Sequence, residues 1–80
     1  MKIYKYKDQC NASGKRIREE RERVHLSQEQ LAAKLQLKGF NLNQKAISRI
    51  ETGSRIVTDY ELYAFSKVFC VPMQSLLTIE

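Results

Sequence analysis

Polar and apolar residues alternate at helical spacing along residues 43–55, NQKAISRIETGSR. Ala46, Ile47 and Ile50 fall on one side, which is typical of a helix face that packs on a core. The other side carries amide, hydroxyl and basic groups: Asn43, Gln44, Lys45, Ser48 and Arg49. Amides can pair with adenine, and Arg or Lys with guanine, in the DNA major groove. This face therefore predicts base contacts, although a polar front is also what any surface helix presents.

The overall charge favours a polyanionic partner. Fourteen Lys and Arg against nine Asp and Glu give the 80-residue chain a net charge of +5 and a pI near 9.4. Nucleic acid and anionic membrane both fit such a charge. The basic residues are spread over several predicted helices instead of one polybasic amphipathic stretch, which makes a membrane-surface module the weaker interpretation. Double-stranded DNA is the partner we expect.

Length and residue content argue against an enzyme. Eighty residues predict one small domain, which is short for a closed active-site cleft. The only histidine is His25, and the sequence has no Gly-rich phosphate loop. Cys10 and Cys70 lie far apart without a CxxC pair, so we expect reduced thiols and no metal or cofactor. Cys70, among apolar neighbours in KVFCVP, is expected in the core.

The sequence predicts neither membrane insertion nor export. No apolar run approaches the roughly 18 residues of a membrane span. The first residues, MKIYKYKD, lack the apolar region of a signal peptide. We therefore expect a cytoplasmic protein.

Five helices are predicted, which gives an all-α domain. They are a helix from Lys15, Gln28–Leu37, a helix after Asn43 that ends before Gly53, a helix after Thr58, and a short one from Pro72. Ser27 and Gln30 have the spacing of a capping box, and Glu19 and Arg23 that of an i,i+4 ion pair. The stripes expected in the core are Ile17 with Val24, Leu31 with Ala32 and Leu35, Ile47 with Ile50, Leu62 with Phe65 and Phe69, and Leu76 with Leu77.

Residues 1–13, MKIYKYKDQCNAS, lie outside this helical pattern. Basic and apolar residues alternate from Lys2 to Lys7, which suits a short edge strand with basic residues on one face. Chain termini are also commonly loose. Two interpretations stay open: a mobile tail, or a strand that pairs with its copy across a dimer.

Four segments follow one another in an order that resembles a known family. GKRIREERE, LSQEQLAAKL, AISRIETGSR and VPMQSLL lie between Gly14 and Leu77. Together they resemble the Xre/Cro repressor family of helix-turn-helix domains, and SQEQLA combined with ISRIETG is the most specific part. The resemblance implies a five-helix, lambda-repressor-like DNA-binding domain over residues 14–80, preceded by the tail or strand of residues 1–13.

The resemblance also implies residue roles. Asn43, Gln44, Lys45, Ser48 and Arg49 would contact bases. Gln28, at the start of the second helix, would bond a phosphate with help from the positive helix end. Ser54 and Arg55 match the family's phosphate-contacting loop.

An ion pair is expected between Arg21 and Glu51. The resemblance implies it, and the residue pattern agrees because Arg21 shares an apolar stripe with Ile17 and Val24, where an unpaired charge is costly. Glu51 is therefore expected to be a structural residue and not an acid–base catalyst.

Two features depart from the family pattern. The connection between Leu35 and Ile47 is longer than the usual tight turn, which affects the angle between the second and third helices and could bring Lys38 to an extra phosphate. Cys70 lies where the family often has glycine. It would adopt a left-handed conformation, or the turn is built differently.

We expect a repressor that binds a pseudo-palindromic operator as a homodimer, with half-sites about 34 Å apart or a multiple of it. Dimer contacts could come from the C-terminal residues Met73, Leu77 and Ile79 or from the N-terminal strand. The alternative is an antitoxin-like module that binds a regulatory protein partner and uses DNA binding for autoregulation.

Overall fold

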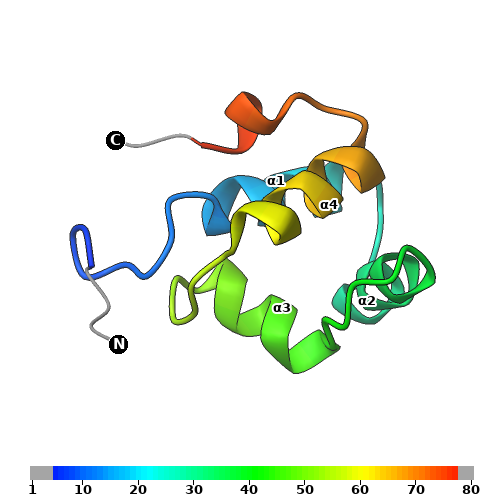
Figure 1. Ribbon diagram of the computed structural model, residues 1–80, viewed down its shortest axis with the longest axis horizontal. Helices are drawn as coiled ribbons and strands as arrows, with labels where there is room; N and C mark the ends of the chain where they lie inside the picture. Colours follow the sequence, from blue (N-terminus) through cyan, green and yellow to red (C-terminus); the bar gives the residue numbers. More distant parts are fainter. Residues whose placement is uncertain (1–4, 78–80) are drawn as a thin grey trace.

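Helix α3, which carries the polar face, is held in an all-helical domain (Figure 1). The structure is a computed structural model that describes residues 5–77. Its elements are α1 (Gly14–Arg23), α2 (Gln28–Leu37), α3 (Gln44–Glu51), α4 (Asp59–Phe69) and the 3₁₀ helix η1 (Met73–Leu76). Residues 5–77 contain no strand longer than an isolated bridge.

Side-chain caps fix where three helices begin, as the sequence predicts. Ser27 and Gln30 form a capping box on α2, with hydrogen bonds of 2.8 and 3.0 Å. Thr58 caps α4 in the same way. Asn43 Oδ1 accepts a hydrogen bond from the backbone N–H of Ala46 at 2.8 Å. Each cap satisfies a backbone donor that has no partner within its helix.

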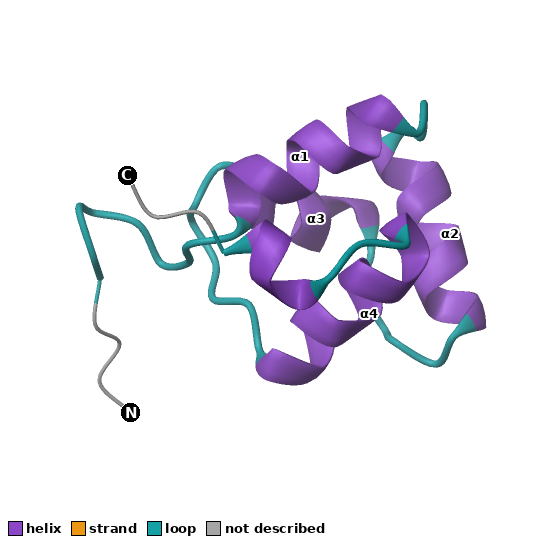
Figure 2. Cartoon of the chain, turned by 90° about the horizontal axis from the view of Figure 1, so that it is seen from above, coloured by secondary structure: helices purple, strands orange, loops and turns teal. Residues whose placement is uncertain are grey.

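The apolar stripes of the helices meet in one core. Its buried hydrophobic residues are Ile17, Leu31, Ala32, Leu35, Leu42, Ile47, Ile50, Leu62, Ala64, Phe65, Phe69 and Leu76. Helix α3 packs on α1 and α2, whereas η1 packs on α1 and α4. Figure 1 therefore shows α3 and η1 on opposite sides of the domain. Seen from above in Figure 2, α3 lies behind the other helices.

The prediction of a fifth α-helix from Pro72 is wrong. Four residues form a 3₁₀ turn there, in which the Ser75 N–H donates to Pro72 O and the Leu77 N–H to Gln74 O, both at 3.1 Å. At about three residues per turn, adjacent leucines face different ways. Leu76 is buried, but Leu77 is 50% exposed, so its predicted core position is also wrong. Ile79 lies outside the described residues.

The prediction that Cys70 is a core residue is wrong as well. Cys70 is exposed, and its φ of 56° places it in the left-handed region at the end of α4. There the Val71 N–H reaches back to Ser66 O at 3.1 Å. The chain reversal needs a left-handed residue at this point, and it turns the thiol toward solvent. Of the two conformations left open for this turn, the left-handed one is therefore found.

Surface charges on α1 pair differently from the prediction. Glu19 bonds Arg16 at 3.1 Å, and Arg23 pairs with Glu20. Arg16 also bonds Glu20 at 3.1 Å. The expected Glu19–Arg23 pair is wrong because the carboxylate of Glu20, which is largely buried, attracts the guanidinium groups on both sides of it.

The N-terminal residues that the structure describes form a tight turn. Tyr6 and Gln9 make an isolated antiparallel bridge, with Lys7 and Asp8 at φ 51° and 63° between them. Successive left-handed residues are typical of a hairpin turn. The first half of the predicted alternation, Lys2 to Tyr4, lies outside the described residues.

Candidate nucleic-acid interface

Helix α3 presents two different faces. Ile47 and Ile50 are fully buried against the core. The predicted base-contacting residues lie on the other side: Asn43, Gln44, Lys45 and Arg49 are exposed and Ser48 is half-buried. The polar face is therefore open to a partner.

The long turn between α2 and α3 is anchored in the core. Gly39 takes the positive φ expected of it, 89°, and the Phe40 N–H donates to Leu35 O at 3.0 Å. Leu42 is 2% exposed, and its carbonyl accepts a hydrogen bond from Gln36 Nε2 at 3.3 Å. Sequence reasoning missed Leu42 because it is one apolar residue in the polar run FNLN. Its burial fixes the entry to α3 despite the extra length.

An amide pair joins the starts of α2 and α3. Gln44 Nε2 donates to Gln28 Oε1 at 2.6 Å, and Gln28 Nε2 donates to Glu51 Oε1 at 3.0 Å. Each amide nitrogen carries two N–H groups and each amide oxygen two lone pairs. Both side chains thus keep bonding capacity for a further partner. The sequence shows both glutamines but not that they touch, since they lie 16 residues apart.

The chain of hydrogen bonds continues into a mostly buried ion pair. Arg21 Nε and Nη2 donate to Glu51 Oε2 and Oε1 at 2.7 and 3.0 Å. The side chains are 13% and 3% exposed, and Arg21 Nη1 also donates to Leu26 O at 2.9 Å. Hydrogen bonding to Glu51 raises the pKa of Arg21 against the opposing effect of burial. The pair ties the C-terminal end of α3 to α1.

The loop after α3 holds two of the four predicted phosphate contacts, Ser54 and Arg55. Ser54 is exposed, its N–H donates to Arg49 O at 2.8 Å, and its hydroxyl lies 3.1 Å from that of Thr52. Arg55 instead forms two hydrogen bonds to Glu61, of 2.9 and 3.1 Å.

These contacts also shift the pKa of Glu61. Burial raises it, but hydrogen bonds from Arg55 and Thr58 outweigh burial, and the pKa is lowered. Arg55 therefore links the loop to α4.

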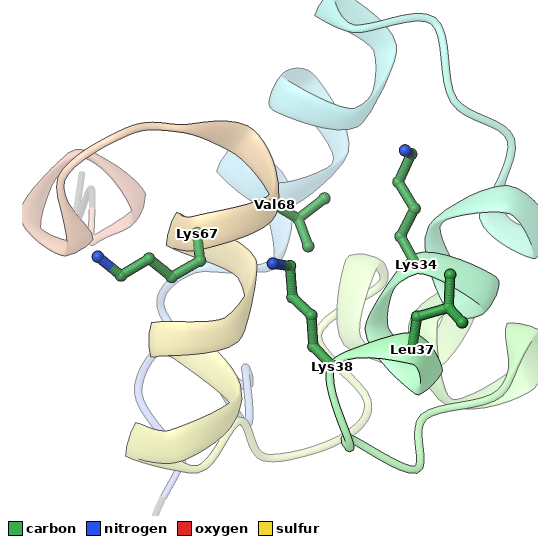
Figure 3. A pocket seen from close by; sticks show the side chains of 5 residues that line it. All are labelled: Lys34, Leu37, Lys38, Lys67 and Val68. Carbon is green, nitrogen blue, oxygen red and sulfur yellow. The ribbon is translucent and has the colours of Figure 1, made fainter.

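Lys38 lies apart from the other predicted contacts. It is the C-cap of α2 and lines a shallow depression between α2 and α4 (Figure 3). The other lining residues are Lys34, Leu37, Lys67 and Val68. Figure 3 shows the Lys38 side chain pointing across to Val68 on α4. Its ammonium group thus joins a basic surface of α2 and α4.

Residues 5–77 contain neither a metal-binding cluster nor a membrane-spanning helix. Among residues 5–77, no three His, Cys, Asp or Glu side chains are grouped so that they could bind a metal ion. In the same part of the chain, no helix has the length and apolar character needed to cross a membrane.

Comparison with known proteins decides the family. Residues 17–76 match the helix-turn-helix family model. The chain belongs to the Xre/Cro-like helix-turn-helix family. The resemblance noted in the sequence is thereby confirmed, and the family is one of DNA-binding transcription regulators. In its terms α2 and α3 are the helix-turn-helix pair, and α3 is the recognition helix. Searches of curated proteins and of solved structures gave no match.

Proposed function

We propose that this helix-turn-helix protein is a sequence-specific double-stranded DNA-binding regulator that represses transcription by occupying its operator. The amide pair Gln28–Gln44, fixed at its base by Glu51, carries the proposal. It holds two polar side chains at the start of the recognition helix, where a helix in the major groove meets base edges and phosphates. A cytoplasmic location follows from the proposed partner.

The proposed base contacts lie along the exposed face of α3. Gln44 retains a carbonyl lone pair and an N–H, the combination that pairs with adenine N7 and N6. Arg49 lies one turn further on and is exposed, as a bidentate contact to guanine requires. The remaining members of this set are Asn43, Lys45 and Ser48.

The proposed phosphate contacts flank α3. Gln28, in the first turn of α2, keeps one N–H for a phosphate oxygen near the positive helix end. Ser54 offers an exposed hydroxyl beyond the other end of α3. Arg55 has five N–H donors, of which Glu61 and Ile56 O take three, so it could bond a phosphate as well. Lys38 is the most remote member of the set.

Homodimer formation is part of the proposal. A single small module makes few base contacts, and two-fold pairing on a pseudo-palindrome doubles them. At the C-terminal end, Leu77 is half exposed and Met73 only partly buried, which offers apolar surface to a second copy. The N-terminal segment is the other route.

A protein-binding role is the second candidate function. Tyr60 is 76% exposed and Tyr63 48%, and both lie on α4. Exposed aromatic side chains are enriched at protein interfaces. An antitoxin-like module would use this surface for a regulatory protein and DNA binding for autoregulation.

Selection of bound duplexes from a random pool tests the function. We expect enrichment of a pseudo-palindrome, and binding that weakens with salt with a slope of about −0.9 in log K per phosphate neutralised. No enrichment together with a flat salt dependence would contradict DNA binding. Binding to a partner protein that the Tyr60 and Tyr63 alanine variants lose, with DNA affinity unchanged, would favour the second candidate.

A further inference from the structure

The segment before α1 is bonded to the end of the recognition helix. The Cys10 N–H donates to Gly53 O at 2.9 Å. Asn11 Nδ2 donates to Ile50 O at 3.0 Å and to Arg55 O at 2.7 Å. These contacts join parts of the chain about 40 residues apart, and Figure 1 shows the chain before α1 running beside the loop after α3.

Two glycines allow this close approach. A Cβ on Gly53 would lie 1.6 Å from Gln9 Oε1, and a Cβ on Gly14 would lie 2.1 Å from Ile50 O. The φ of Gly53 is 78°, which also favours glycine. Gln9 thus lies directly over the loop, and the start of α1 lies directly against the end of α3.

We propose that residues 9–11 act as a clasp that orders the loop Gly53–Arg55, with Asn11 as its main positioning residue. The Ile50 carbonyl already accepts a hydrogen bond from the Gly53 N–H at 3.0 Å, and Asn11 adds a second donor there while it also holds the carbonyl of Arg55. An ordered loop loses less conformational freedom when it binds. The clasp therefore raises DNA affinity without touching DNA, an inference that depends on the proposed function.

The clasp residues lie outside the part of the chain that matches the family. The family match begins at residue 17, after residues 9–11. Their role in the loop therefore follows from the contacts of this chain.

Asn11 also supports the start of α1, and this role must be separated from its contacts to the loop. Its Oδ1 accepts a hydrogen bond from the Gly14 N–H at 2.7 Å, which supports the start of α1. Serine retains an oxygen acceptor for such a turn but has no amide N–H₂ to reach two carbonyls. Asn11→Ser therefore removes the donors with least harm to α1. Gln74→Ser is the matched control, because Gln74 is an exposed amide on η1.

Amide hydrogen exchange tests the clasp in the free protein. In Asn11→Ser we expect the N–H groups of Gly53 and Ser54 to exchange roughly two- to tenfold faster, with the α4 amides unchanged. Gln9→Ala, which keeps the Asn11 bonds, should loosen Gly53 less and serves if Asn11→Ser fails to fold. Unchanged exchange in the loop would overturn the proposal.

DNA binding tests the consequence of the clasp. On a selected operator, Asn11→Ser should weaken binding roughly two- to tenfold, with the salt slope and the base preference retained, because the loop makes the same contacts at a higher ordering cost. A loosened loop with unaltered affinity would overturn the role in binding. If the wild-type chain binds no duplex, the proposed function fails, and the exchange result still decides whether Asn11 orders the loop.

Discussion

The two ends of the recognition helix are built in opposite ways. At the N-terminal end of α3, Gln44 and Lys45 are exposed, and a single amide contact to Gln28 at 2.6 Å restrains Gln44. At the C-terminal end, the side chain of Glu51 is 3% exposed and bonded to both Arg21 and Gln28. Gln44 and Lys45 thus stay open to a partner, whereas the carboxylate of Glu51 has its partners inside the protein.

The difference has a physical reason. A side chain that contacts bases must exchange water for base edges, so it has to stay accessible with unused donors and acceptors. A helix that presents such side chains needs a fixed direction, and a buried ion pair has a strong geometric requirement because an unpaired buried charge is costly. We infer that the buried Glu51 at the C-terminal end sets the orientation of α3, and that the exposed face from Asn43 to Arg49 supplies the contacts.

The largest expected effect comes from breaking the buried end. Glu51→Ala leaves Arg21 without its carboxylate, and we expect the free energy of unfolding to fall by about 3–5 kcal/mol. Denaturant unfolding measures this loss. Glu19→Ala, which removes a carboxylate that is 48% exposed, is the matched control, with an expected change of about 0–1 kcal/mol. Equal losses for the two variants would contradict the special role of Glu51.

A smaller effect is expected at the open face, on specificity and not on folding. Arg49→Ala should cost about 1–3 kcal/mol of discrimination at one base position and leave unfolding nearly unchanged. Arg18→Ala on α1, where the side chain is 60% exposed, removes the same charge as a control. If the selected sequence profile of Arg49→Ala equals that of the wild type, Arg49 contacts no base.

Gln28→Ala tests whether Gln28 contacts a phosphate and not a base. It removes a proposed phosphate contact, so binding should weaken on all sequences alike, by roughly 0.5–1.5 kcal/mol. Competition binding with the operator and with unrelated duplexes measures it. A loss confined to one base position would instead make Gln28 a base-contacting residue.

Asn43→Ala tests whether the N-cap of α3 contributes to the stability of the domain. The cap bond to the Ala46 N–H at 2.8 Å is lost, which should destabilise the domain by about 1 kcal/mol. Thermal unfolding detects such a change. Asn41→Ala is the control, since Asn41 is an exposed residue of the preceding turn. An equal effect of both substitutions would show that the cap contributes little.

The smallest expected effect is on the pH dependence of stability, through Glu61, which Arg55 of the loop after α3 contacts. The pKa of Glu61 is lowered below its ordinary value of 4.5, so the ionised carboxylate stabilises the fold at neutral pH. This contribution is lost as pH falls below about 4.5 and through the folded-state pKa. Glu61→Gln should therefore lose less stability than the wild type over this range in urea unfolding. If both proteins lost the same stability over this pH range, Glu61 would not contribute to the acid dependence of unfolding.

Local features were predictable from the sequence where local physics decides them. The start of α2 at Gln28 and the caps Asn43 and Thr58 follow from side chains that bond the backbone three residues on. The two faces of α3 follow from the helical period. The family follows from the order of its segments, which the match over residues 17–76 confirms.

Errors arose where the path of the chain beyond a helix decides which side chains face the core. Leu77 has the apolar character of a core residue, but the 3₁₀ turn allows only Leu76 to face inward. The hydrogen bonds of Arg55 to Glu61 on α4 were likewise not predictable from its position in the sequence. The exposure of Cys70 depends on how the chain leaves α4. The periodicity of apolar residues in the sequence does not predict these exposures and contacts.

By itself, the sequence determined the four α-helices, the caps of α2, α3 and α4, the apolar stripes of these helices and the polar face of α3, because each depends on neighbours within about four residues. Only the tertiary structure decided that Gln44 touches Gln28 and that Asn11 holds the loop after α3. These contacts join residues far apart in the chain, and they form only when packing of the core has already brought the helices together.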